Sequence, residues 1–79
     1  MIDYNDNNID RLYVSLANKA SYCKKDTVVI YQDSYYAYKS GDINKAKMFL
    51  IENDIPKSLQ EQTNKLINLL WLLYNKLWR

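Results

Sequence analysis

Apolar residues recur at spacings of three and four along most of the chain, which is the period of an amphipathic α-helix. The first run predicts a helix over about residues 8–25, and the second predicts a helix over about residues 27–40 that Asp26 or Thr27 is expected to cap. The apolar faces consist of Ile9, Leu12, Tyr13, Leu16, Ala17 and Ala20 in the first helix, and of Val28, Tyr31, Tyr35 and Tyr38, with Ile30, Ser34 and Ala37 beside them, in the second.

A third, shorter helix is predicted over about residues 42–53. The only glycine of the chain, Gly41, lies where a left-handed cap would end the preceding helix, and Asp42 follows it as an N-cap. Pro56 disfavours helical geometry at the residue before it, so the third helix must end ahead of it. The apolar positions of this helix are Ile43, Ala46, Phe49 and Leu50.

The last predicted helix, over about residues 58–77, is the most informative segment. Ser58 and Glu61 have the spacing of a capping box at its start. A core seam is formed by Leu59, Thr63, Leu66, Leu70, Leu73 and Leu77; a second row beside it consists of Ile67, Trp71, Tyr74 and Trp78, and Leu69 flanks the seam on its other side. Together these positions span an arc of roughly 200°, about twice what a surface helix needs to bury.

The pattern as a whole predicts one all-α domain over residues 1–79, a small bundle of three or four helices. Two main interpretations of the wide apolar arc stay open, besides a weaker third in which Trp78 with Lys76 and Arg79 anchors the helix at a membrane surface. Either the last helix is central and its own chain surrounds it, or part of the Trp71, Tyr74 and Trp78 row is left for a partner. The apolar run at residues 69–73 is too short to cross a bilayer, which takes about 20 residues.

Composition favours the second interpretation. A chain of 79 residues hides only about 60% of its unfolded surface, and domains this small usually add a disulfide, a metal or an oligomer interface. One cysteine and no histidine exclude an internal disulfide and a structural zinc site. We therefore expect a homo-oligomer, with a dimer favoured. The lone cysteine and the lack of a secretory signal pattern favour the cytoplasm.

The residue inventory argues against catalysis. No histidine is available to activate a serine or Cys23, and no glycine-rich loop is available to hold a phosphate. The carboxylates are scattered among helix caps and exposed positions, and Cys23 is expected to be a small buried hydrophobe. We expect no catalytic residue, no metal ligand and no cofactor.

The stretch YYAYKSGDINKAKMFL, from Tyr35 to Leu50, resembles the centre of a tetratricopeptide repeat. In that family a Gly-Asp pair follows an aromatic-rich helix end, and the next helix opens with a fixed alanine; Gly41, Asp42 and Ala46 occupy those places. The resemblance implies an antiparallel helical hairpin and a protein-binding habit. Such repeats are also similar to the three-helix domains of the microtubule-interacting and transport family.

A nucleic-acid-binding regulator is the alternative. Ala37 and Gly41 have the four-residue offset of a helix-turn-helix, and Lys39, Lys45 and Lys47 would supply its cations. The net charge of +2 is mild for such a role, so the primary prediction is a protein–protein interaction module that uses the aromatic row of its last helix. Richness in Asn, Lys, Ile and Tyr suggests an A/T-rich genome, which would suit a small viral or mobile-element protein.

Overall fold

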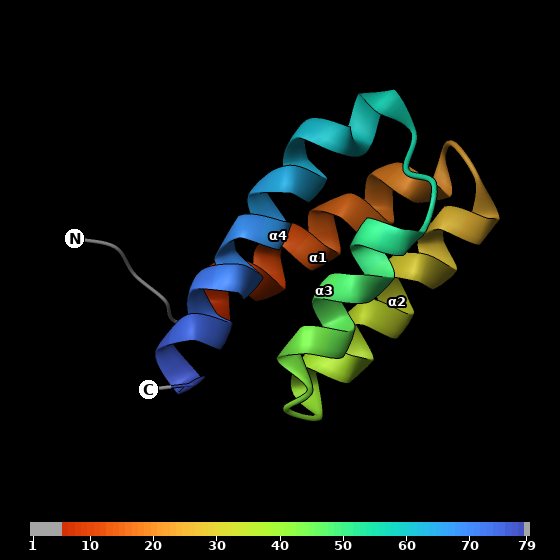
Figure 1. Ribbon diagram of the computed structural model, residues 1–79. Helices are drawn as coiled ribbons and strands as arrows, with labels where there is room; N and C mark the ends of the chain where they lie inside the picture. Colours follow the sequence, from red (N-terminus) through yellow and green to blue (C-terminus); the bar gives the residue numbers. More distant parts are fainter. Residues whose placement is uncertain (1–5, 79) are drawn as a thin grey trace.

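The computed structural model describes residues 6–78, with side chains described for residues 8–76. Within these residues the chain forms α1 (Asp6–Ser21), α2 (Lys25–Lys39), α3 (Ile43–Glu52) and α4 (Lys57–Trp78), and no strand. Each helix packs against the next, running in the opposite direction, and α4 closes the bundle against α1 (Figure 1). In this view α3 and α4 form the front layer and α1 and α2 the back layer. The predicted all-α bundle is confirmed.

The core lies along the axis that the four helices share. Its side chains occupy the helix faces that the three-and-four spacing predicted, because each helix turns its apolar stripe toward the other three. The buried apolar residues are Ile9, Tyr13, Leu16, Ala20, Tyr31, Ala37, Tyr38, Ile43, Ala46, Leu50, Leu59, Leu66 and Leu70. Of the predicted seam of α4, the rest of the chain encloses Leu59, Thr63, Leu66 and Leu70. Leu73 is half-buried, and the side chain of Leu77 lies outside the described residues.

Three predictions about the first turn of the bundle are wrong. The first helix ends at Ser21 rather than near residue 25, because the next inward-facing position after Ala20 is Lys24, whose charge is costly to bury. Cys23 consequently lies in the turn and is exposed, instead of being buried on a helix face. The second helix starts at Lys25 with Lys24 as its N-cap, so Asp26 lies inside the first turn and does not cap it.

The turn between α2 and α3 follows its prediction closely. Gly41 has a φ of 92°, which a residue with a side chain rarely adopts. The amide of Asp42 donates to the carbonyl of Ala37 at 3.0 Å and the amide of Gly41 donates to that of Tyr38 at 3.1 Å, the pattern of a Schellman cap. Asp42 then caps α3, since its Oδ1 accepts from the amide of Lys45 at 3.1 Å.

The predicted capping box of α4 is not formed. The helix starts at Lys57, so Ser58 lies within the first turn, after the N-cap position. The amide of Leu59 donates instead to the carbonyl of Pro56 at 2.9 Å. Proline favours helix starts because its ring fixes φ near the helical value, and here that preference outweighs the serine signal.

Buried hydroxyl groups link helices that the apolar core alone would not hold in register. The Oγ of Ser34 donates to the carbonyl of Ala46 at 2.7 Å and lies 2.8 Å from the hydroxyl of Tyr13. A hydroxyl has one proton to donate, so Tyr13 must be the donor to Ser34. This chain of bonds connects α1, α2 and α3.

A second chain of bonds crosses the bundle from α2 to α4. The hydroxyl of Tyr31 lies 2.7 Å from Oγ1 of Thr63, which donates to the carbonyl of Leu59 at 2.7 Å. The same one-proton argument makes Tyr31 the donor. These two helices lie diagonally opposite, so the bond fixes their relative height across the core.

The two buried phenols make the fold sensitive to alkali. Burial raises the pKa of both Tyr13 and Tyr31 above the ordinary value of 10.0. The unfolded chain therefore releases these protons first, and stability is lost as the pH rises above about 10, by up to about 1.4 kcal/mol per pH unit for each tyrosine. Urea unfolding at rising pH measures the loss. Tyr13→Phe should reduce it and Tyr22→Phe, at an exposed site, should not; stability that stays flat through this range would contradict the argument.

Candidate interaction surface

The outer edge between α3 and α4 carries part of the apolar surface that the bundle leaves uncovered. The two helices have 10 and 22 residues, so α3 is about 15 Å long beside about 33 Å of α4. The shorter helix cannot cover the whole side of the longer one. Trp71 of α4 accordingly keeps 46% of its surface exposed, and Ile51 of α3 keeps 53%.

Five residues make up this surface, which we call the α3–α4 edge. Trp71 and Tyr74 are stacked, with ring centroids 6.3 Å apart and an interplanar angle of 23°. Ile51 follows Lys47 by one turn of α3, and Ile67 precedes Trp71 by one turn of the antiparallel α4, so both isoleucines flank the rings on the same side. Ile67 and Tyr74 are half-buried against the core.

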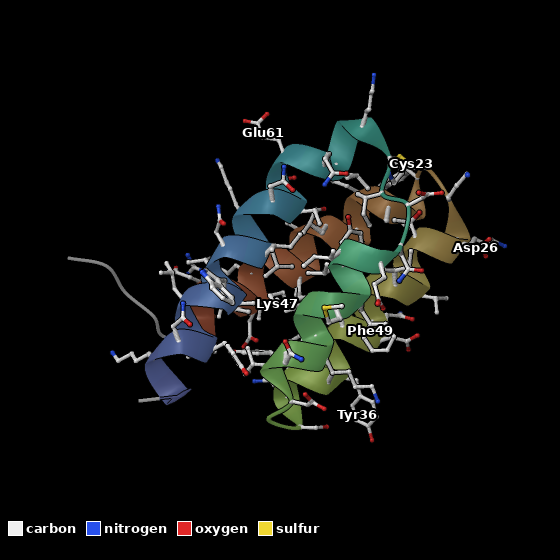
Figure 2. All side chains as sticks on the ribbon, viewed as in Figure 1. Cys23, Asp26, Tyr36, Lys47, Phe49 and Glu61 are labelled. Carbon is white, nitrogen blue, oxygen red and sulfur yellow. The ribbon has the colours of Figure 1, made fainter. Side chains whose placement is uncertain are left out.

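Lys47 reaches across from α3 to the rings of α4. Its Nζ lies 4.1 Å from the centroid of Trp71 and 5.3 Å from that of Tyr74. An ammonium over an aromatic face is attracted by about 0.5–1 kcal/mol when exposed and by more when desolvated. Lys47, labelled in Figure 2, thus covers part of the two rings from the middle of α3.

The edge has no carboxylate of its own. The described ion pairs include that of Lys39 with Asp10, and none of them involves Lys47. The single acidic residues of α3 and α4, Glu52 and Glu61, both lie near the connection between these helices, and Figure 2 places Glu61 at the far end of α4 from Lys47. The two helices together hold five lysines against these two glutamates.

The predicted row of α4 is placed as follows. Trp71, Tyr74 and Ile67 lie together on the α3–α4 edge, whereas Leu69 is half-buried against the core on the other side of the seam. The side chain of Trp78 lies outside the described residues. Ile51 and Lys47 belong to the edge but were not predicted for it, because their own helix gives no sign of which neighbour it faces.

Comparisons with protein-family models, with curated proteins and with solved structures find no match for this chain. The resemblance of Tyr35 to Leu50 to a tetratricopeptide hairpin therefore stays a prediction. The function has to rest on the geometry of the chain itself.

The three lysines considered for nucleic-acid binding do not form one patch. Lys39 pairs with Asp10 at 3.5 Å, with its Nζ 5.7 Å from the rings of two tyrosines of α2. Lys45 lies 6.0 Å from the ring of Phe49, in the groove that α3 forms with α2, whereas Lys47 faces α4. Tyrosine rings could stack on the bases of single-stranded nucleic acid. Of the tyrosines at positions 31, 35, 36 and 38, however, two are buried and only Tyr36 is exposed.

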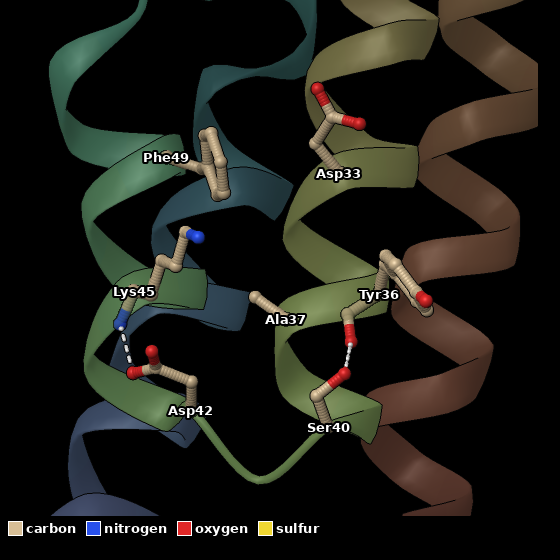
Figure 3. Close-up of a pocket in the computed structure, with 7 residues that line it drawn as sticks. All are labelled: Asp33, Tyr36, Ala37, Ser40, Asp42, Lys45 and Phe49. Carbon is tan, nitrogen blue, oxygen red and sulfur yellow. Dashed lines mark hydrogen bonds between the residues drawn. The ribbon is translucent and has the colours of Figure 1, made fainter.

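A shallow groove of about 420 Å³ separates α2 from α3 near the Gly41 turn (Figure 3). It is lined by Asp33, Tyr36, Ala37, Ser40, Asp42, Lys45 and Phe49. Asp42 already caps α3, and Ser40 donates to the carbonyl of Tyr36 at 2.9 Å, so part of its polar lining serves the turn. Within the part of the chain that the structure describes, there is neither a group of three or more potential metal ligands nor a helix long and apolar enough to span a membrane.

Proposed function

We propose that this chain is a non-enzymatic protein–protein interaction module that docks through the α3–α4 edge. The observation that carries the proposal is the exposed Trp71, which is stacked on Tyr74. By helix spacing Ile67 lies one turn before Trp71 on α4, and Ile51 lies one turn after Lys47 on α3. Buried aromatic residues surrounded by apolar neighbours dominate the binding energy of protein interfaces. A half-exposed tryptophan on a rigid helix can be covered with little loss of conformational entropy.

The other exposed apolar residues form a less suitable surface for binding a partner. Val14, Tyr22, Val29 and Tyr36 are spread over α1, α2 and the turn between them, and single exposed hydrophobic residues are normal on protein surfaces. The α3–α4 edge differs because it exposes a tryptophan that is stacked on Tyr74 and contacted by Lys47 from the neighbouring helix. Nucleic-acid binding is not favoured, since Lys39, Lys45 and Lys47 face three different neighbours.

The Trp78→Phe variant provides the test, because it leaves Trp71 as the only tryptophan of the chain. The partner is either another protein or the second copy that the sequence favours. Its binding should shift the fluorescence emission of Trp71 to shorter wavelength and reduce the quenching of that fluorescence by acrylamide. Trp71→Ala should raise the dissociation constant about 30-fold, the factor for the roughly 2 kcal/mol that a central hot spot contributes.

Sedimentation equilibrium over the micromolar range measures self-association, and titration with the peptides described below measures docking of another chain. The matched control is Tyr36→Ala, which removes an aromatic side chain that is 76% exposed on α2. If Trp71→Ala leaves both kinds of association unchanged, or if Tyr36→Ala has the larger effect, the proposed surface is wrong.

A further inference from the structure

Any partner that covers Trp71 also covers Lys47. The Nζ of Lys47 lies over the indole at 4.1 Å, so a surface that packs on this ring removes water from the ammonium as well. Burying a charge without a partner of opposite sign is strongly unfavourable, whereas an ion pair with good hydrogen bonds offsets most of that cost. The α3–α4 edge supplies no carboxylate for this purpose, because Glu52 and Glu61 lie toward the connection between the helices.

The positive charge at the edge comes from Lys47 rather than from the layer as a whole. The helices α3 and α4 hold five lysines and two glutamates, but Asp42, the N-cap of α3, and Asp54, in the connection to α4, bring the acidic residues of this layer to four. An acidic partner is therefore favoured by its contact with Lys47.

The row of apolar residues on the edge has the length of a short helical segment. Ile67, Trp71 and Tyr74 extend over two turns of α4, about 10 Å, beside the parallel line of Lys47 and Ile51 on α3. An amphipathic helix laid along such a line of side chains contacts it with residues at positions i, i+3, i+4 and i+7.

Building on the proposed function, we infer that the occupant of the α3–α4 edge is an acidic amphipathic helical segment of another protein, whose apolar face covers Trp71 and whose carboxylate pairs with Lys47. A second copy of this chain is a poorer occupant. Packing two such edges together would bury two Lys47 ammonium groups, and neither edge would provide a carboxylate.

Nucleic acid is also anionic, but it fits the edge less well. Phosphates could pair with Lys47, yet Ile51 and Ile67 beside the rings offer aliphatic surface, on which bases do not stack as they do on aromatic rings. The other two candidate lysines, Lys39 and Lys45, face elsewhere.

Three peptides of matched sequence test the inference. Each carries leucine at the i, i+3, i+4 and i+7 positions, and the flanking positions are all glutamate, all glutamine or all lysine. Binding is followed at low and high salt, through Trp71 emission in the Trp78→Phe variant and by isothermal titration calorimetry in every variant, including Trp71→Ala. We expect the glutamate peptide to bind at least about tenfold more tightly than the lysine peptide at low salt, with the difference shrinking as salt screens the charges.

Lys47→Met keeps the length of the side chain over Trp71 and removes its charge. It should abolish the preference for glutamate over glutamine, whereas Lys65→Met, at an exposed position of α4, should preserve most of it. Equal binding of all three peptides, lost in Trp71→Ala, would overturn the acidic partner and leave the docking surface standing. No binding of any peptide, together with a monomer at all concentrations, would overturn the proposed function as well.

Two further outcomes would replace the inferred occupant. A wild-type dimer that Trp71→Ala dissociates would identify a second copy as the occupant. A single-stranded oligonucleotide that quenches Trp71 and loses its affinity in Lys47→Met would identify nucleic acid.

Discussion

Leu66→Ala is expected to lower the free energy of unfolding by about 3 kcal/mol, within the range of about 2–5 kcal/mol for large-to-small changes in a core. Leu66 lies in the middle of α4, has 0% of its surface exposed and belongs to the seam that the other helices enclose. Small domains have total stabilities of about 5–15 kcal/mol, and one of this size should fall near the lower end. A loss of this size would leave a measurable unfolded fraction at room temperature.

Urea unfolding followed by circular dichroism measures the effect, and Leu72→Ala is the matched control. It makes the same substitution in the same helix, at a position that keeps 37% of its surface exposed. We expect it to cost less than half as much as Leu66→Ala, because less apolar surface returns to water and no cavity is formed. Equal costs at the two positions would mean that the packing of α4 differs from that described above.

The helix faces could be predicted because burial in a bundle depends on local periodicity. The seam from Leu59 to Leu70 and the face from Ile9 to Ala20 follow directly from residues at three-and-four spacing. Gly41 was equally informative, since it has the positive φ that the Schellman cap requires. In each case a few neighbouring residues determine the result.

The helix ends were harder to predict because several signals compete there. Ser58 and Glu61 have the spacing of a capping box, but the preference of proline for helix starts outweighs it and α4 begins at Lys57. Cys23 was expected on a helix, and its exposure follows only from the early end of α1 at Ser21. A weak cap or a single charge changes the free energy of a helix end by about 1 kcal/mol. The competing positions at which a helix could end are therefore difficult to rank from sequence.

The candidate surface was predicted only in part. The row containing Ile67 and Trp71 could be predicted because the apolar arc of the last helix is wider than a surface helix needs to bury. Lys47 and Ile51 could not be assigned to it, because their place depends on which side of α3 turns toward α4. The sequence grouped Lys47 with other cations as a nucleic-acid contact, whereas in the fold its nearest aromatic partner is Trp71.

Ser34→Ala is expected to lower the free energy of unfolding by more than Tyr13→Phe does, about 2 kcal/mol against about 1 kcal/mol, although both remove the same hydrogen bond. Loss of the serine hydroxyl leaves the buried phenol of Tyr13 without an acceptor and also removes the bond from Ser34 to the carbonyl of Ala46. Loss of the phenol hydroxyl leaves Ser34 bonded to Ala46. The expected order therefore reflects an unsatisfied donor, which is more costly than an unused lone pair.

The double variant separates this effect from simple loss of contacts. Once Tyr13 is phenylalanine, no phenol remains to be left unsatisfied, so Ser34→Ala should cost less in that background than in the wild type. A double-mutant cycle from urea unfolding should give a coupling of about 1 kcal/mol between the two positions. Additive costs would mean that the two hydroxyls do not depend on each other. Ser34 would then contribute only through its bond to α3, and the link from α1 would not help to set the register of the bundle.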